Sequence, residues 1–104
     1  DDLISSSRSI ITVGRYDEDV INDIPIVEEH SSYVSRKHCT IERNISNQSW
    51  YIRDGQWERG STNGWKNSLN GTFLNSTEVN IRGTQLRDGD IISIGDVKLR
   101  VELY

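Results

Sequence analysis

The sequence is poor in cysteine, proline and long apolar runs, and each shortage excludes something. Its single cysteine, Cys39, cannot form a disulfide within the chain. With one proline and no long low-complexity block, its composition is that of a folded domain. No apolar run approaches the roughly 18 residues of a membrane span, and the amino terminus does not resemble a signal peptide. We therefore expect a folded cytoplasmic domain with no membrane partner.

The chain also lacks an excess of positive charge. Twelve lysines and arginines stand against 16 acidic residues, for a formal net charge of -4. Such a chain repels the phosphate backbone of DNA and RNA, so we expect no nucleic-acid partner. A small anion held at one local cluster of cations stays compatible with this charge.

Length predicts one domain. The 104 residues are enough for one hydrophobic core and too few for two, so we expect a single domain over residues 1–104. Methionine is absent and the chain starts abruptly at Asp1-Asp2, which favours a segment of a larger polypeptide. Residues 1–8 are mostly polar and serine-rich, and are interpreted as a frayed tail or a short edge strand.

Short strand-like runs separated by turn signals recur along the chain. The expected strands are 10–13, 24–27, 38–43, 50–53, 72–74, 78–81, 91–94 and 97–103. Gly95-Asp96 is the strongest hairpin signal. Alternation places one set of side chains toward a core: Cys39, Ile41, Trp50, Ile52, Val97, Leu99, Val101 and Leu103. Many short strands without sustained helical periodicity predict an all-β sandwich.

One stretch interrupts this pattern. Residues 56–68 contain few strand formers, and they hold Trp57 and Trp65 among glycines and polar residues. Structureless loops of this length are uncommon in a compact domain. We therefore expect an inserted surface loop, either packed on itself or functional.

Three polar stretches are placed to bind an anion together. Ser35-Arg36-Lys37-His38 offers a hydroxyl, two cations and an imidazole just before a strand. Gly14-Arg15 and Ser68-Leu69-Asn70-Gly71-Thr72 lie where other strand-like runs meet a turn. The functional hypothesis requires that these three stretches converge in space.

Catalysis and metal binding find little support. Neighbouring residues of a strand point to opposite faces, so Cys39 and His38 cannot form a thiolate–imidazole pair. The only other histidine, His30, lies in a polar loop without ligand spacing to His38. We expect no enzyme activity, no cofactor and no metal site. Lys37 is interpreted as a solvated cation.

Four motifs occur in an order that resembles a known family. They are Gly14-Arg15, Ser35-Arg36-Lys37-His38, Asn70-Gly71-Thr72-Phe73-Leu74-Asn75 and Leu86-Arg87-Asp88-Gly89-Asp90-Ile91-Ile92-Ser93-Ile94-Gly95. The chain resembles a forkhead-associated (FHA) domain from about Ile10 to its end. The resemblance implies a β-sandwich of two antiparallel sheets whose loops at one end bind phosphothreonine peptides. It therefore implies a module for phosphorylation-dependent protein–protein interaction.

The resemblance also implies a role for each matching residue. The positions that hold the phosphate are Arg15, Ser35 and Arg36. The position that grips the peptide main chain is Asn70. The positions that support the site are Gly14, His38 and Gly71. The positions that select the ligand residue beyond the phosphothreonine are Tyr33 and Val34.

The sequence departs from the family pattern in two places. Leu69 stands where relatives often have a threonine or serine that contributes a phosphate hydrogen bond. This favours an alternative function, an FHA-like scaffold that binds partners independently of phosphate. The motif of serine, any residue, asparagine and glycine also occurs earlier, at Ser61-Thr62-Asn63-Gly64. We prefer the later copy because only it continues as Thr72-Phe73-Leu74-Asn75; otherwise Asn63 replaces Asn70.

Overall fold

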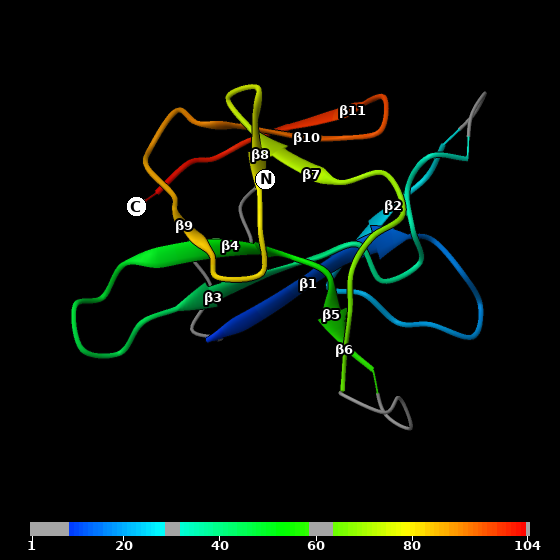
Figure 1. Ribbon diagram of the computed structural model, residues 1–104, viewed down its shortest axis with the longest axis horizontal. Coiled ribbons are helices and arrows are strands. Elements are labelled where there is room, and N and C mark those ends of the chain that lie inside the picture. The colour runs from blue at the N-terminus through cyan, green and yellow to red at the C-terminus, as the bar shows by residue number, and fades with distance from the viewer. Residues whose placement is uncertain (1–8, 29–31, 59–63, 104) are drawn as a thin grey trace.

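The computed structural model describes residues 9–28, 32–58 and 64–103, and these contain eleven strands and no helix (Figure 1). Within that part of the chain nothing helical is therefore available to cross a membrane. The strands are β1 (Ile10–Arg15), β2 (Ile24–Ile26), β3 (Cys39–Arg43), β4 (Trp50–Asp54), β5 (Gln56–Trp57), β6 (Trp65–Lys66), β7 (Thr72–Leu74), β8 (Thr77–Val79), β9 (Thr84–Gln85), β10 (Ile91–Ile94) and β11 (Val97–Arg100). The two interpretations of residues 1–8 lie outside the described residues.

The first sheet has five strands in the order β2-β1-β3-β4-β9. All its pairs are antiparallel except β1 and β2, which pair in parallel from Val13 opposite Ile24 to Arg15 opposite Ile26. This parallel pair departs from the expected antiparallel sheets. Because β2 spans only three residues, roughly 10 Å, a short connection suffices to return the chain to its start. Pro25 lies in this edge strand, where its missing N–H leaves no ladder hydrogen bond unmade.

The second sheet is antiparallel, in the order β11-β10-β7-β8. The hairpin predicted at Gly95-Asp96 is confirmed, with Ile94 paired to Val97. A second tight hairpin joins β7 to β8, where Asn75 and Ser76 have φ values of 50° and 73°. Positive φ at both central residues gives the turn a twist that matches the strands. Strands β8 and β11 end two and three residues earlier than the pattern predicts.

The core lies between these two sheets, which Figure 1 shows as two layers. Its buried side chains are Ile11, Val13, Ile26, Val34, Cys39, Ile41, Trp50, Ile52, Leu74, Val79, Leu86, Ile92, Ile94 and Val101. Val97, Leu99 and Leu103 pack against it and are partly buried. Alternate residues of β3, β4 and β10 therefore point inward, as the sequence pattern predicts.

The stretch 56–68 forms a ribbon in its described part. Strands β5 and β6 pair antiparallel, with Gln56 opposite Lys66 and Trp57 opposite Trp65. The ring of Trp57 lies so close to Gly64 that a Cβ there would be 2.2 Å from it. The expected loop is therefore a two-stranded ribbon packed on its own tryptophan. The earlier motif copy at Ser61-Thr62-Asn63 lies outside the described residues.

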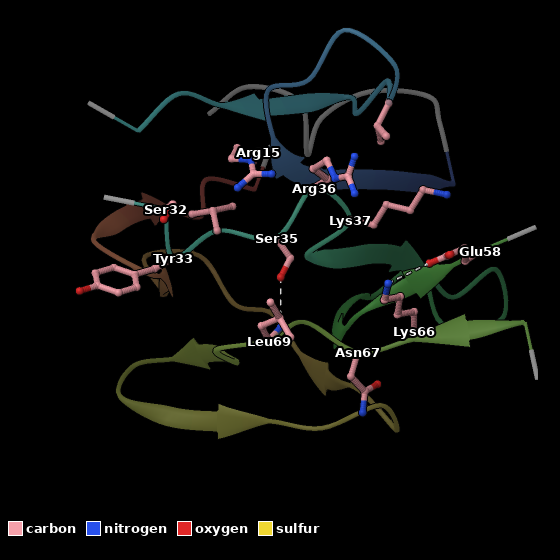
Figure 2. A pocket seen from close by; sticks show the side chains of 12 residues that line it. Arg15, Ser32, Tyr33, Ser35, Arg36, Lys37, Glu58, Lys66, Asn67 and Leu69 are labelled. Atoms are coloured by element: carbon pink, nitrogen blue, oxygen red, sulfur yellow. Dashed lines mark hydrogen bonds and ion pairs between the residues drawn. The ribbon is translucent and has the colours of Figure 1, made fainter. Parts of the chain in front are cut away.

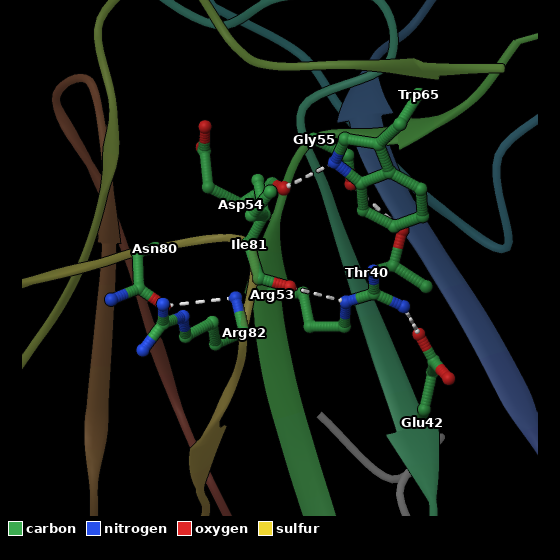
Figure 3. A network of polar contacts seen from close by, with 9 residues as sticks. All are labelled: Thr40, Glu42, Arg53, Asp54, Gly55, Trp65, Asn80, Ile81 and Arg82. Atoms are coloured by element: carbon green, nitrogen blue, oxygen red, sulfur yellow. Dashed lines mark hydrogen bonds and ion pairs between the residues drawn. The ribbon is translucent and has the colours of Figure 1, made fainter. Parts of the chain in front are cut away.

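The ribbon is attached to β4 through Trp65 (Figure 3). The Trp65 indole nitrogen donates to the main-chain oxygen of Asp54 at 3.0 Å. The Arg53 guanidinium stacks 4.1 Å from the centre of the Trp65 ring and also donates to Glu42 at 2.7 Å. A cation held against an indole face in this way contributes about 0.5–2 kcal/mol. These contacts hold β6, and the loop that follows it, against the first sheet.

Candidate phosphate-binding site

A cavity of about 400 Å³ opens where the predicted stretches meet (Figure 2). The described residues that line it are Arg15, Val20, Ser32, Tyr33, Val34, Ser35, Arg36, Lys37, Glu58, Lys66, Asn67 and Leu69. Four of these side chains are cationic and one is acidic. The chain as a whole carries a net charge of -4, so the positive charge is concentrated locally.

Arg15 is the last residue of β1 rather than part of a turn. Its main-chain nitrogen donates to the carbonyl of Ser35 at 2.9 Å, which joins the strand end to the loop before β3. Its guanidinium lines the cavity and makes no hydrogen bond or ion pair with the described residues. All of its donors are therefore available to a ligand.

Gly14 allows β1 and the loop before β3 to touch. A Cβ at this position would lie 2.1 Å from the carbonyl oxygen of Arg36 and 2.8 Å from the side-chain nitrogen of Asn22. Real Cβ atoms do not approach backbone oxygens so closely, so only glycine fits. The sequence analysis placed Gly14 at a turn, whereas the structure places it within β1, where its small size positions Arg36.

Asn22 and Gln56 are buried amides that the sequence analysis missed. The Gln56 side-chain nitrogen donates to the carbonyl of Val13 at 2.8 Å, to the Asn22 side-chain oxygen at 2.9 Å and to the carbonyl of Cys39 at 3.1 Å. Asn22 in turn donates to the carbonyl of Arg36 at 2.7 Å. Hydrogen bonds therefore connect β1 and β3 to the loop that carries Arg36. Neither amide has a sequence signal, because each lies in a stretch that reads as polar loop.

His38 is completely buried and joins two loops. Its Nδ1 accepts a hydrogen bond from the Ser35 amide at 3.0 Å, so the ring proton is on Nε2, which donates to the carbonyl of Gly71 at 2.7 Å. Burial lowers the pKa of His38 below its ordinary 6.5, although the Gly71 hydrogen bond and the charges of Asp54 and Glu28 oppose this. Neither ring nitrogen is free to take a proton from the Ser35 hydroxyl.

Ser35 faces the cavity, and its hydroxyl contacts a second loop, residues 68–71 between β6 and β7. Its Oγ accepts a hydrogen bond from the Leu69 amide at 3.1 Å, the contact drawn as a dashed line in Figure 2. The hydroxyl hydrogen therefore stays available to donate. The Leu69 side chain is 88% exposed, so the residue at this departure from the family pattern contributes its backbone to the site.

The second loop is fixed from below by Asp54, a buried residue at the end of β4. One carboxylate oxygen accepts from the hydroxyls of Ser68 and Thr72 at 2.6 and 2.8 Å, and the other from the Ser68 amide at 3.2 Å. The Ser68 Oγ also accepts from the Gly71 amide at 2.9 Å. The sequence analysis gave Asp54 no role, so its part in shaping the 68–71 loop was missed.

Asn70 joins the two loops on the outside of the molecule. Its side-chain nitrogen donates to the carbonyl of Tyr33 at 2.9 Å. Its side-chain oxygen accepts no hydrogen bond from the described residues, so it can still accept one from a ligand. Gly71, which follows it, has a φ of 88°, a conformation that favours glycine.

The two residues predicted to select the ligand differ sharply in exposure. Tyr33 is 53% exposed, whereas Val34 is 1% exposed and belongs to the core. Their amides donate to the carboxylate of Glu28 at 3.1 and 3.0 Å, which holds this loop in place. The geometry favours Tyr33 as a ligand contact and limits what the Val34 side chain can reach.

Lys37, interpreted from the sequence as a solvated cation, also lines the cavity. The exposed Arg36 side chain forms a long ion pair with the partly buried Asp17 at 3.7 Å. Arg15 at the end of β1 thus lies close to the loop that carries Ser35 and Arg36, and Asn70 contacts that loop from the loop before β7, as the hypothesis required.

Comparisons of the sequence and of the structure with known proteins find relatives in the same family. The sequence matches the family described as FHA domain over residues 11–95. The chain is similar to the second FHA domain of an ABC transporter from Mycobacterium tuberculosis, with 30% identity over 89% of this chain and 67% of that chain, and a TM-score of 0.60. Full-length yeast Pml1p is 31% identical over 88% of this chain and 57% of that chain, with a TM-score of 0.64.

A third solved structure, from work on phosphothreonine-dependent FHA domain interactions, shares the fold. It has a TM-score of 0.68 and 24% identity over 95% of this chain and 81% of that chain. No curated protein sequence matches the chain closely. Because the family match extends over most of the sequence and the fold agrees, this chain belongs to the FHA-domain family.

Proposed function

We propose that this domain binds phosphothreonine-containing peptides and so mediates phosphorylation-dependent protein–protein interactions. The observation that carries the proposal is the single cavity in which Arg15, Arg36 and Ser35 meet. Phosphothreonine carries about -1.5 to -2 charges near neutral pH and three acceptor oxygens. Two guanidinium groups and a hydroxyl supply fixed donors for them, which allows an acidic domain to capture an anion.

The energetics fit a transient signalling contact. Charge-assisted hydrogen bonds contribute about 1.5–3 kcal/mol each, so two or three account for much of a micromolar affinity near about -8 kcal/mol. Arg36 must release Asp17 to hold a phosphate. A long pair like this one, at 3.7 Å and with one exposed partner, contributes at most about 1 kcal/mol, so its loss costs little.

In this proposal Asn70 holds the peptide main chain. Its side-chain nitrogen is occupied by the Tyr33 carbonyl, so its oxygen is the atom offered to an amide of the ligand. The other contacts between the loops hold them at a fixed distance from each other before a ligand binds. His38 and Gly71 supply one cross-link, and Gly14 allows the close approach of β1 to the Arg36 loop, which reduces the ordering cost of binding.

We further propose that the domain is a non-catalytic, cytoplasmic part of a larger protein. Both nitrogens of the His38 ring are engaged by main-chain groups, so Ser35 has no general base beside it. Burial raises the pKa of the Cys39 thiol, which keeps it protonated and unreactive. The family itself consists of interaction modules.

No observation favours the alternative of a phosphate-independent scaffold. That alternative rested on Leu69, whose side chain lacks a hydroxyl. The Leu69 amide nevertheless donates to the Ser35 hydroxyl, a contact that any residue except proline can make at this position.

The proposal is tested by calorimetry with a phosphothreonine peptide selected from an oriented library. We expect micromolar binding and no measurable binding of the same peptide without its phosphate. A library that is captured equally well before and after phosphatase treatment would support the scaffold alternative. A preference at the third residue after the phosphothreonine that disappears in Tyr33→Ala would assign selectivity to that side chain.

A further inference from the structure

Two lysines line the cavity beyond the groups that one phosphate requires. The chain has three lysines in all, and both Lys37 and Lys66 lie here, while Lys98 is exposed on β11. Lys37 follows Arg36 on the loop before β3, and Lys66 comes from β6 on the other side of the cavity (Figure 2). Lys37 lies within one of the motifs, but neither lysine is among the residues assigned to the phosphate.

The charge and size of the cavity exceed those of one phosphate. Its lining carries four cations and one carboxylate, a surplus of three positive charges, and a phosphate removes at most about two. At about 400 Å³ it falls within the range of sites that hold whole small ligands. Charge and space both remain after Arg15, Arg36 and Ser35 have been used.

The chemistry of the two lysines suits a second, less rigidly placed anion. A lysine is a point charge on a flexible stem with three donors, whereas the planar fork of arginine holds a phosphate in one geometry. Lys37 forms no ion pair with the described residues. Lys66 lies 3.9 Å from the carboxylate of Glu58, a long and exposed contact that contributes little stability.

We propose that Lys37 and Lys66 form a second anion subsite, so that the domain prefers phosphothreonine peptides carrying another anionic group near the phosphothreonine. This inference rests on the proposed function. The shared chemistry is a second anion on the same peptide, supplied either by an aspartate or glutamate or by a second phosphorylated residue. Glu58 occupies Lys66 in the free domain and is displaced by that anion.

The experiment compares three series of peptides by calorimetry at low salt. The first contains phosphothreonine with neutral neighbours; the second places glutamate, and the third phosphoserine, at successive positions on either side. At one or two positions we expect glutamate to tighten binding about three- to fivefold, the range of an exposed charge pair, and phosphoserine to tighten it further. The gain should shrink at high salt, because exposed charges are screened.

Three variants assign the gain to the two lysines. In the double variant Lys37→Ala and Lys66→Ala, the ratio of affinities between anionic and neutral peptides should fall to about one. In Glu58→Gln the ratio should rise, because Lys66 is no longer partly neutralised. Lys98→Ala removes the same charge on β11 and should leave the ratio unchanged. Thermal unfolding of each variant checks that the fold is retained.

The outcomes separate this inference from the proposed function. If the neutral phosphothreonine peptide binds but no position shows a gain, or the double variant keeps the gain, the second subsite is wrong and the proposed function stands. If no phosphothreonine peptide binds at all, both are overturned. A gain with phosphoserine but not with glutamate would identify the second anion as a phosphate, and a gain with both would include acidic residues.

Discussion

At the scale of single residues, Gly14 decides whether Arg36 can reach the site. We expect Gly14→Ala to weaken phosphopeptide binding strongly, because its Cβ would lie 2.1 Å from the Arg36 carbonyl and must push that loop away. Overpacking of this kind costs about 1–3 kcal/mol of stability. Urea denaturation and calorimetry measure the two effects.

Gly89→Ala is the matched control for this substitution. A Cβ there has no atom within 4 Å, so the change adds only backbone strain at a φ of 89°. We expect it to cost about 1 kcal/mol of stability and to leave the affinity for the peptide unchanged. Equal affinities for the two alanine variants would show that Gly14 does not position Arg36.

Arg36 also offers a test of charge. Arg36→Glu should abolish phosphopeptide binding, because a cation that faces the phosphate becomes an anion. Its side chain is 57% exposed and the change loses the pair with Asp17, so the free energy of unfolding should fall by no more than about 1 kcal/mol. Arg100→Glu makes the same charge change on β11 and should bind normally, which separates the local effect from the change in net charge. Unchanged affinity in Arg36→Glu, measured by calorimetry, would exclude Arg36 from the phosphate site.

At the scale of elements, Asp54 joins the end of β4 to the loop between β6 and β7. We expect Asp54→Asn to lower the free energy of unfolding by about 2–4 kcal/mol, because the new amide donor faces hydroxyl and amide donors of Ser68 and Thr72. Hydrogen exchange of the 68–71 amides should accelerate, and phosphopeptide affinity should fall with it.

Asp96→Asn is the control for Asp54, since it makes the same change in the exposed turn between β10 and β11. It should alter neither the stability nor the exchange rates of the 68–71 loop by a measurable amount. If Asp54→Asn behaved like Asp96→Asn, the carboxylate would not be what shapes the peptide-binding loop.

At the scale of the whole molecule, His38 makes stability depend on pH. Burial lowers its pKa in the folded state below the ordinary 6.5 of the unfolded chain. Between those two values the unfolded chain binds more protons, so the free energy of unfolding should fall as the pH drops below about 6.5, by up to about 1.4 kcal/mol per pH unit. Once the pH is below the folded pKa, this residue adds no further slope.

Urea denaturation of the wild type at several pH values between about 7.5 and 5.5 measures this effect. His38→Gln should be less stable at every pH, because it loses a cross-link between the two loops, but its stability should vary less over this range. Stability should be the readout rather than peptide affinity, because the phosphate itself titrates near pH 6. An equal slope in wild type and variant would assign the pH dependence elsewhere.

Much of the fold of this molecule can be predicted from short stretches of its sequence. Alternation of buried and exposed residues locates most strands, because side chains on a strand alternate between two faces. A glycine followed by a polar residue marks the hairpin at Gly95-Asp96. The order of the motifs around Arg15, Ser35 and Asn70 identifies the family, although the phosphate and peptide roles of these residues stay predictions.

Other features depend on partners that only the tertiary structure brings together. Gln56 bonds Asn22 and Val13, which are 34 and 43 residues away in the chain, and Asp54 fixes a loop 14 to 18 residues later. Lys37 and Lys66 share one cavity although they belong to separate elements. Local patterns report which face of a strand a residue occupies, whereas hydrogen bonds and electrostatic fields act through space. The sequence by itself therefore determined most of the strands and the motif residues. The tertiary structure decided which buried residues support the site and which charged side chains share its cavity.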